Sequence, residues 1–302
     1  MASKLVGFIG VGLMGHGMAK NILEKGFDLL VMAHRNRAPV DDLLARGARE
    51  AASPREIAAA ADFIVLCVTG SPQVEALVRG ADGILAGARP GLIVIDSSTS
   101  DPVSTAALAQ ELAGVGAALV DAPLSRTPKE AEAGTLDCMV GGDHAAFEAA
   151  LPVIQCFAAK IVHVGPPGAG HTMKLLNNFV SIGYAALYSE ALALGAKSGI
   201  MPAAFHAVIG GGRMSCGFYD TFMKYVVERD RDAHKFTIAN AHKDMRYLAN
   251  LANSAGVASL LGSTVKGYLS TAEATGKGGD YLPMLSDHVA ALNGVSLTPA
   301  TG

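Results

Sequence analysis

The chain has 302 residues, of which 50% are hydrophobic and 17% are charged, and its formal net charge is -3 at pH 7. This composition can build a large core, and the length suits two domains or one large domain. The near-neutral charge provides no basic surface of the kind that binds nucleic acid, so we expect no nucleic-acid partner.

Targeting and metal-binding signals do not stand out in the sequence. The residues after Met1 lead straight into an apolar strand, and every apolar run of about 18 residues has a polar interruption, so we expect neither a signal peptide nor a membrane span. The four cysteines are scattered singly and predict neither a zinc site nor a disulfide framework. We therefore expect a cytoplasmic protein without a bound metal.

The first predicted element is a short apolar strand, Leu5–Ile9, followed by a glycine-rich stretch and a helix that runs to about Lys25. In this glycine pattern the first glycine permits a tight turn, the second lets the backbone approach a pyrophosphate, and the third lets helix and strand pack closely. Free N–H groups at the helix N-terminus favour phosphates. We predict that a dinucleotide binds to Gly10, Gly12, Leu13, Met14 and Gly15.

A second strand is predicted at Asp28–Met32. In dinucleotide-binding domains the residues that follow this strand determine whether NAD or NADP binds. NAD enzymes usually place Asp or Glu at this point to bind the ribose 2′-hydroxyl. This chain has Ala33-His34-Arg35-Asn36-Arg37 instead, and the arginines suit a 2′-phosphate. We predict NADP as the cofactor, with NAD possible, bound near His34, Arg35 and Asn36. The alternative is that Arg35 and Arg37 are charges of a surface loop.

Strand and helix patterns then alternate. Helices are expected at Pro54–Ala61 and Ser104–Gly114, and strands at Phe63–Val68, Leu92–Asp96, Ala117–Asp121, Met139–Gly142 and Lys160–Val164. This order predicts an α/β fold of the Rossmann type over residues 1–165, a doubly wound and mostly parallel sheet with helices on both faces. Ligands bind beyond the carboxyl ends of such strands, so Thr69, Thr99 and Ser125 should lie on the side of the glycine-rich loop.

A long helix is expected from about Gly170. Four polar residues lie on one face of it at positions i, i+3, i+4 and i+7, namely Lys174, Asn177, Asn178 and Ser181. A polar stripe on an apolar helix is costly to bury unless each group has a partner. We interpret the stripe as facing the substrate, and the alternative is an exposed hydrophilic face.

Beyond about Gly195 only helical patterns remain, at Pro202–Ile209, Tyr219–Arg229, Ile238–Ser254, Ser259–Thr275 and Leu282–Leu292. They predict an all-helical domain over residues 166–302, joined to the first domain by the long helix, with a loose tail from Ser296 to Gly302. The long helix is apolar on several sides, which predicts a homodimer or homotetramer.

These motifs resemble the β-hydroxyacid dehydrogenase family, which includes 3-hydroxyisobutyrate dehydrogenase and tartronate semialdehyde (2-hydroxy-3-oxopropionate) reductase. The resemblance runs from residue 7 to residue 244 and rests on Gly7–Gly15, Asp96-Ser97-Ser98-Thr99, Asp121-Ala122-Pro123-Leu124-Ser125, Gly168-x-Gly170-x-x-x-Lys174-x-x-x-Asn178, and Phe236 with Lys243-Asp244.

The resemblance implies hydride transfer between a nicotinamide and a small anionic hydroxy acid or its aldehyde. Lys174 would be the acid/base, and Asn178 would orient it or the substrate hydroxyl. Ser125 and Thr127 would bind the substrate, while Lys243 would contact the cofactor and Asp244 would order Lys243 and the pocket wall. The alternative for Lys243-Asp244 is a surface pair on an amphipathic helix.

One departure from the family concerns the substrate. Arg126-Thr127 stands where the family usually has Gly-Gly, and this resembles the sulfolactaldehyde reductases. In that subgroup the residues matching Arg126, Asn177 and Ser181 bind the sulfonate. Ser125 departs from the Gly of the subgroup, and Lys129 and Glu130 are also atypical of it.

The sequence therefore predicts an NAD(P)-dependent β-hydroxyacid dehydrogenase or semialdehyde reductase, of the 3-hydroxyisobutyrate or 2-hydroxy-3-oxopropionate type. Two alternatives stay open, a sulfolactaldehyde reductase and a dinucleotide-binding scaffold without catalysis. An imine reductase has a related fold, but the presence of Lys174 counts against that reading.

Overall fold

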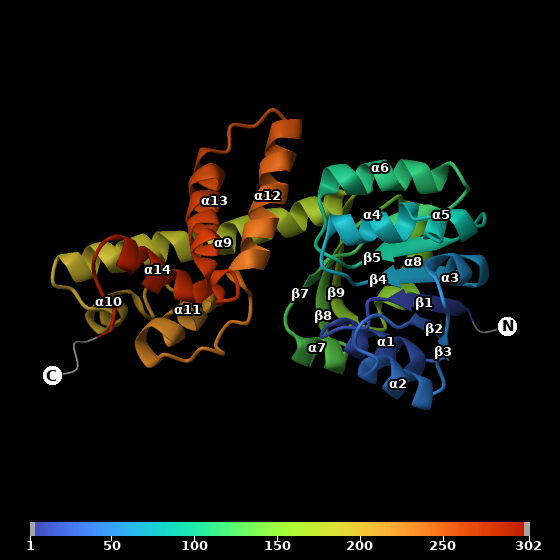
Figure 1. Cartoon of the computed structure of the whole chain (residues 1–302), viewed down its shortest axis with the longest axis horizontal. Helices are drawn as coiled ribbons and strands as arrows, with labels where there is room; N and C mark the ends of the chain where they lie inside the picture. The colour runs from blue at the N-terminus through green and yellow to red at the C-terminus, as the bar shows by residue number, and fades with distance from the viewer. Residues whose placement is uncertain (1–3, 299–302) are drawn as a thin grey trace. The chain divides into compact units, whose positions relative to one another are not determined.

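The structure is a computed structural model that describes residues 4–298, and the chain divides into two compact units, Met1–Lys174 and Leu175–Gly302 (Figure 1). The division falls inside the long helix α9 (Ala169–Lys197), which is continuous through both units. The boundary proposed from the sequence, between residues 165 and 166, lies just before this helix.

The first unit is built on a nine-stranded sheet in the order β3-β2-β1-β4-β5-β6-β8-β7, with β9 paired to β8. The strands β1 to β6 that neighbour one another run parallel, whereas β8 runs antiparallel to β6 and β7. The mostly parallel, doubly wound sheet predicted from the sequence is confirmed. The strands are β1 (Leu5–Ile9), β2 (Asp28–Met32), β3 (Arg49–Glu50), β4 (Phe63–Leu66), β5 (Ile93–Asp96), β6 (Ala118–Asp121), β7 (Leu124–Ser125), β8 (Leu136–Gly141) and β9 (Ala158–Gly165).

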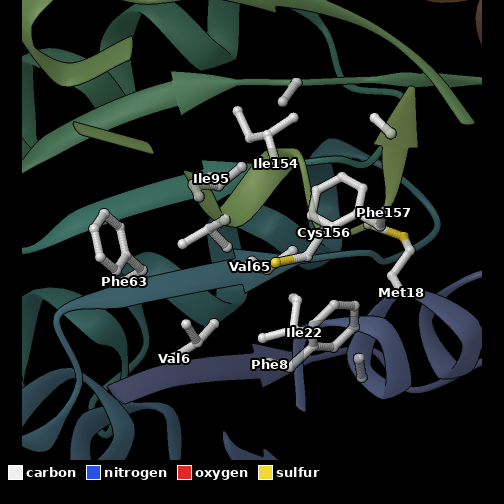
Figure 2. Packing of buried hydrophobic residues seen from close by; sticks show 14 of the residues in the cluster. Val6, Phe8, Met18, Ile22, Phe63, Val65, Ile95, Ile154, Cys156 and Phe157 are labelled. Atoms are coloured by element: carbon white, nitrogen blue, oxygen red, sulfur yellow. The ribbon is translucent and has the colours of Figure 1, made fainter. Parts of the chain in front are cut away.

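Helices cover both faces of this sheet (Figure 1). On one face α1, α2 and α8 pack against alternate strand residues such as Phe8 and Val65, and Figure 2 shows Met18 and Ile22 of α1 in this layer. On the other face α3 to α6 pack against residues such as Ile64 and Val94. The helices are α1 (Gly15–Glu24), α2 (Ala38–Ala45), α3 (Pro54–Ala60), α4 (Ser71–Arg79), α5 (Ile84–Gly87), α6 (Pro102–Ala113), α7 (Pro128–Ala133) and α8 (His144–Ile154).

The second unit is helical, as predicted, and its described residues form only one isolated β-bridge, Thr237 with Tyr281. Its core is apolar and rich in aromatic residues such as Tyr219 and Phe222. The elements that follow α9 are α10 (Pro202–Ile209), α11 (Gly217–Glu228), α12 (Ile238–Ser254), α13 (Leu260–Ala272), the irregular turn Glu273–Lys277, the short 3-10 helix Leu282–Met284 and α14 (Leu285–Leu292).

The chain's end differs in part from the prediction. The predicted helix Ser259–Thr275 is α-helical from Leu260 to Ala272 and continues as the π-helical turn Glu273–Lys277, in which Gly276 takes a left-handed φ of 81°. The expected loose tail is wrong for its first part, because Leu297 is buried in the core of the second unit. The rest of that tail, residues 299–302, lies outside the described residues.

By length and composition alone, α9 is the one helix in residues 4–298 that could cross a membrane. Core helices of soluble proteins pass the same test, so this is weak support for a membrane span. The helix also carries Lys174, the buried Asn178 and the exposed Glu190 along its length.

Candidate active site

The glycine-rich loop is shaped partly by the protein's own packing. Gly10 has a φ of 103°, and a Cβ there would lie 2.2 Å from the carbonyl oxygen of Cys67. A Cβ on Gly15 would lie 2.0 Å from the carbonyl oxygen of Gly10, at the start of α1. A Cβ on Gly12, in contrast, would meet no described atom within 4 Å. The first and third glycines are therefore required by the fold, and the second leaves its backbone open to a ligand.

A cavity of about 500 Å³ opens beside this loop. It lies where the strand order reverses, beyond the carboxyl ends of β1, β2 and β4, which is where doubly wound sheets bind their ligands. Six of the residues predicted to bind the cofactor line it: Gly10, Gly12, His34, Arg35, Asn36 and Thr69. The size and the open glycine fit a dinucleotide cofactor.

The loop after β2 gives different surroundings to its two arginines. Within residues 4–298 neither His34 nor Arg35 makes a hydrogen bond or ion pair, and both side chains line the cavity. Arg37 instead lies 2.9 Å from Glu50 and 3.1 Å from Asp41, and hydrogen bonds to these carboxylates raise its pKa. The surface-charge alternative therefore holds for Arg37, and Arg35 is the arginine left for a 2′-phosphate.

Some predicted cofactor residues do not line this cavity. Among its described lining residues, Leu13, Met14, Gly15 and Thr99 are missing, and so is Lys243, which belongs to the second unit. The sequence reasoning in turn missed Gln73, in the first turn of α4, and Cys67. Both follow the carboxyl end of β4, so the strand-end rule could have identified them.

The predicted substrate turn joins β7 to α7. Arg126 has a φ of 88°, in the left-handed region that favours glycine. Its Nε lies 3.0 Å from Oδ1 of Asp137 on the neighbouring strand β8. Thr127 and Glu130 form a reciprocal capping box at the start of α7. The atypical Glu130 therefore has a structural role, which the Thr-x-x-Glu spacing could have revealed.

The polar face of α9 leads into the second unit. Lys174 is half-buried, and one turn later the buried Asn178 donates its Nδ2 to Oδ2 of Asp244 at 2.7 Å. Nζ of Lys243 lies 3.3 Å from the other oxygen of Asp244 and 5.4 Å from the ring centre of Tyr247. Because Asp244 is 3% exposed, the alternative of a surface pair is wrong.

The two remaining residues of the stripe differ in exposure. Asn177 is exposed and donates to Oδ1 of Asn178 at 3.3 Å, whereas Ser181 is half-buried and donates to the backbone oxygen of Asn178 at 3.1 Å. The stripe is therefore mixed, with a buried and partnered Asn178 at its centre and an exposed Asn177 at its edge.

Two family models match the chain. The NAD-binding domain of 6-phosphogluconate dehydrogenase matches residues 5–165, and the NAD-binding domain of NADP-dependent 3-hydroxyisobutyrate dehydrogenase matches residues 168–291. Together these matches take in nearly the whole of the described chain.

Individual relatives agree with the family models. The chain is 36% identical to 2-(hydroxymethyl)glutarate dehydrogenase of Eubacterium barkeri, with 80% of this chain and 79% of the relative covered. It is 32% identical to 3-sulfolactaldehyde reductase of Escherichia coli (strain K12), with 90% and 91% covered. The solved 3-hydroxyisobutyrate dehydrogenase of Mycobacterium tuberculosis is 26% identical, superposes with a TM-score of 0.85, and covers 95% of this chain and 99% of its own. The chain thus belongs to the β-hydroxyacid dehydrogenase family and is an NAD(P)-dependent oxidoreductase that acts on CH–OH groups.

Proposed function

We propose that this enzyme interconverts a small 3-hydroxy acid and its semialdehyde, of the 3-hydroxyisobutyrate or 2-hydroxy-3-oxopropionate type, with NADP as the preferred cofactor. The observation that carries the proposal is the polar face of α9, where Lys174 precedes the buried and hydrogen-bonded Asn178 by one turn. We also assign cofactor binding to the domain of residues 1–165, and substrate binding and oligomerisation to the domain of residues 166–302.

Lys174 is the acid/base of this proposal. When a nicotinamide cofactor is bound, it supplies or accepts the hydride at the carbon of the alcohol. Nζ of Lys174 takes the hydroxyl proton during oxidation and returns it to the carbonyl oxygen during reduction. The half-buried position of Lys174 limits access of water to this proton transfer.

Asn178 acts beside Lys174 through a fixed amide. Its Nδ2 donates to Asp244, and its Oδ1, which accepts from Nδ2 of Asn177 at 3.3 Å, has a second lone pair for the lysine or for a substrate hydroxyl. The ion pair with Lys243 balances the charge of the buried Asp244 carboxylate. Lys243 is also our candidate for a cofactor contact from the second unit.

Arg126 binds the acid group of the substrate in this proposal, with Ser125 and Thr127 as hydrogen-bonding neighbours. A left-handed backbone at a residue with a side chain costs about 1–3 kcal/mol, and such strain clusters at binding sites. Asp137 contacts Nε, which leaves both terminal nitrogens of the guanidinium for a two-point contact with an oxyanion.

A sulfonate substrate is the second candidate. It is favoured by Arg126 in place of glycine and by a relative named 3-sulfolactaldehyde reductase that covers 90% of this chain. In this alternative Asn177 and Ser181 assist Arg126, because a sulfonate has one oxygen more than a carboxylate to satisfy.

For NADP, the proposal rests on the loop after β2. No carboxylate occupies residues 33–37, and Arg35 lines the cavity without an ion pair in the described chain. His34 and Asn36 line the same wall of the cavity, although Asn36 Oδ1 also accepts from the backbone of Ala38 at 3.2 Å. We further propose a soluble, cytoplasmic homodimer or homotetramer.

A substrate panel tests the proposed function. Purified protein is assayed with NADP(H) and NAD(H) on 3-hydroxyisobutyrate, glycerate, tartronate semialdehyde, succinic semialdehyde, dihydroxypropanesulfonate and sulfolactaldehyde. We expect turnover of a carboxylate or sulfonate of three or four carbons, with higher kcat/KM for NADPH. No turnover of any compound with either cofactor would favour the non-catalytic scaffold and contradict the proposal.

A further inference from the structure

A buried histidine lies in the first turn of α9, three residues before Lys174. His171 is fully buried, and none of the sequence motifs gave it a role. Its Nε2 lies 3.1 Å from the carbonyl oxygen of Ser98, and its Nδ1 lies 2.8 Å from Oγ1 of Thr105. A carbonyl oxygen can only accept, so Nε2 is a donor.

The same turn of α9 is held by a buried carboxylate. Asp121 accepts from the backbone N–H of Gly168 and of His171, each at 2.7 Å, and so caps the N-terminus of α9 with a negative charge. A Cβ on Gly170 would lie 2.6 Å from the backbone oxygens of Asp121 and Met139. The first turn of α9 therefore packs directly against the backbone of β6 and β8.

Ser98 connects this turn to the cofactor cavity. Its Oγ accepts from the backbone N–H of Val68 at 3.0 Å, and Val68 lines the cavity. Its own N–H donates to Oδ1 of the buried Asp96 at 2.9 Å. A continuous path of hydrogen bonds thus runs from the cavity wall at Val68 through Ser98 and His171 to the helix that carries Lys174.

From this path we infer that His171 is a positioning residue, which sets the place of the Lys174 ammonium relative to the bound cofactor. The inference rests on the proposed role of Lys174 as acid/base. His171 and Lys174 are three residues apart, on adjacent positions of one helix face, so a shift of the first turn moves both together. A displacement of about 1 Å at a reacting group can cost about a hundredfold in rate.

Three substitutions within the first unit test the inference. His171→Leu removes both ring hydrogen bonds. Thr105→Val removes the Nδ1 bond, together with the bond from Thr105 Oγ1 to the backbone oxygen of Asp101, with little change of shape. His171→Gln restores one donor and serves as the conservative rescue. The matched control is Ser100→Ala, which deletes the buried hydrogen bond from Ser100 Oγ to Asp96 Oδ2 at 3.0 Å and leaves the ring hydrogen bonds of His171 to Ser98 and Thr105 in place.

The readouts are kcat and KM on the best substrate of the panel, the Kd of NADPH from fluorescence, and the isotope effect with deuterated NADPH. For His171→Leu we expect kcat to fall about tenfold to a hundredfold with the cofactor Kd nearly unchanged. The isotope effect on kcat should rise, because the transfer step becomes rate-limiting. His171→Gln should recover more of kcat than Leu, and Ser100→Ala should keep kcat while lowering Tm.

Other results would overturn the inference. Turnover and isotope effect close to those of the wild type in folded His171→Leu and Thr105→Val would leave His171 with a structural role only. If His171→Leu does not fold, the inference is tested by comparing kcat and the isotope effect of Thr105→Val with those of Ser100→Ala. A wild type that is inactive on the whole panel would overturn the proposed function instead, and this role with it.

Discussion

Arg126 occupies a backbone position that glycine fills more easily, since its φ is 88°. If the side chain binds the acid group of the substrate, Arg126→Ala should lower kcat/KM by about tenfold to a few hundredfold, because the anion is left unpaired. Arg126→Lys should recover little, since an ammonium cannot reproduce the two-point contact. Arg126→Gly should lose activity without a loss of Tm, because glycine adopts this left-handed φ without strain. Steady-state kinetics and thermal unfolding measure both, and unchanged kinetics in Arg126→Ala would reduce this residue to a surface charge paired with Asp137.

Arg35 and Arg37 form a natural pair of test and control. Arg35 lines the cavity, whereas Arg37 is bound to Glu50 and Asp41. Arg35→Ala should lower kcat/KM with NADPH about tenfold or more and leave NADH nearly unaffected, because a charge-assisted contact contributes about 1.5–3 kcal/mol. Arg37→Ala should leave the ratio of the two cofactors unchanged. Equal kcat/KM for NADPH and NADH in the wild type would contradict the proposed preference.

The sequence showed that Arg126, Arg35 and Arg37 are unusual residues at their positions, but it did not show the ion-pair partners of Arg126 and Arg37. It marked Arg126 as a departure from the family, yet Asp137 lies on another strand and no local pattern connects the two. It also grouped Arg35 with Arg37, because the ion pair of Arg37 with Glu50 depends on the pairing of β2 with β3. Contacts between strands are set by register, which a single sequence does not display.

Among the elements, α7 offers a test of Thr127. This residue was predicted to bind substrate, and its side chain caps α7 in a box with Glu130. Thr127→Ala should cost about 1 kcal/mol of stability through the lost cap, whereas Thr127→Ser should retain the cap. Thermal unfolding measures the first effect and kcat/KM reports any role in binding. A Thr127→Ala variant with unchanged Tm would contradict the capping role.

Two helices of the second unit have the bounds that the sequence predicted. The helices α10 and α12 begin and end at the predicted residues, because each starts with a clear signal and stays amphipathic. The strands β3 and β7 were missed, since each has two residues and both residues of β3 are exposed. The start of α9 was placed correctly near Gly170, but Asp121, which caps it, lies far away in sequence.

The whole molecule leaves an apolar stripe exposed along α9. Leu176, Val180, Leu187 and Leu194 follow one another at spacings that keep them on one helix face, and Leu187 and Leu194 are 58% and 70% exposed. An apolar face of this length is expected to be covered, and we propose that a second copy of the chain covers it. The double variant Leu187→Glu with Leu194→Glu should therefore lower the mass measured by light scattering. Val257→Glu changes an apolar residue that is exposed outside α9 and serves as the control. A monomeric wild type at micromolar concentration would contradict the oligomer.

We propose that Lys174 moves the proton that accompanies hydride transfer. The most direct test is kcat of Lys174→Ala on the best substrate of the panel, at saturating NADPH, with the Kd of NADPH measured on the same preparation. We predict a loss of about 10² to 10⁴ in kcat, the range for a removed general acid/base, with cofactor binding nearly intact. Turnover within a few-fold of the wild type would show that Lys174 is not the acid/base.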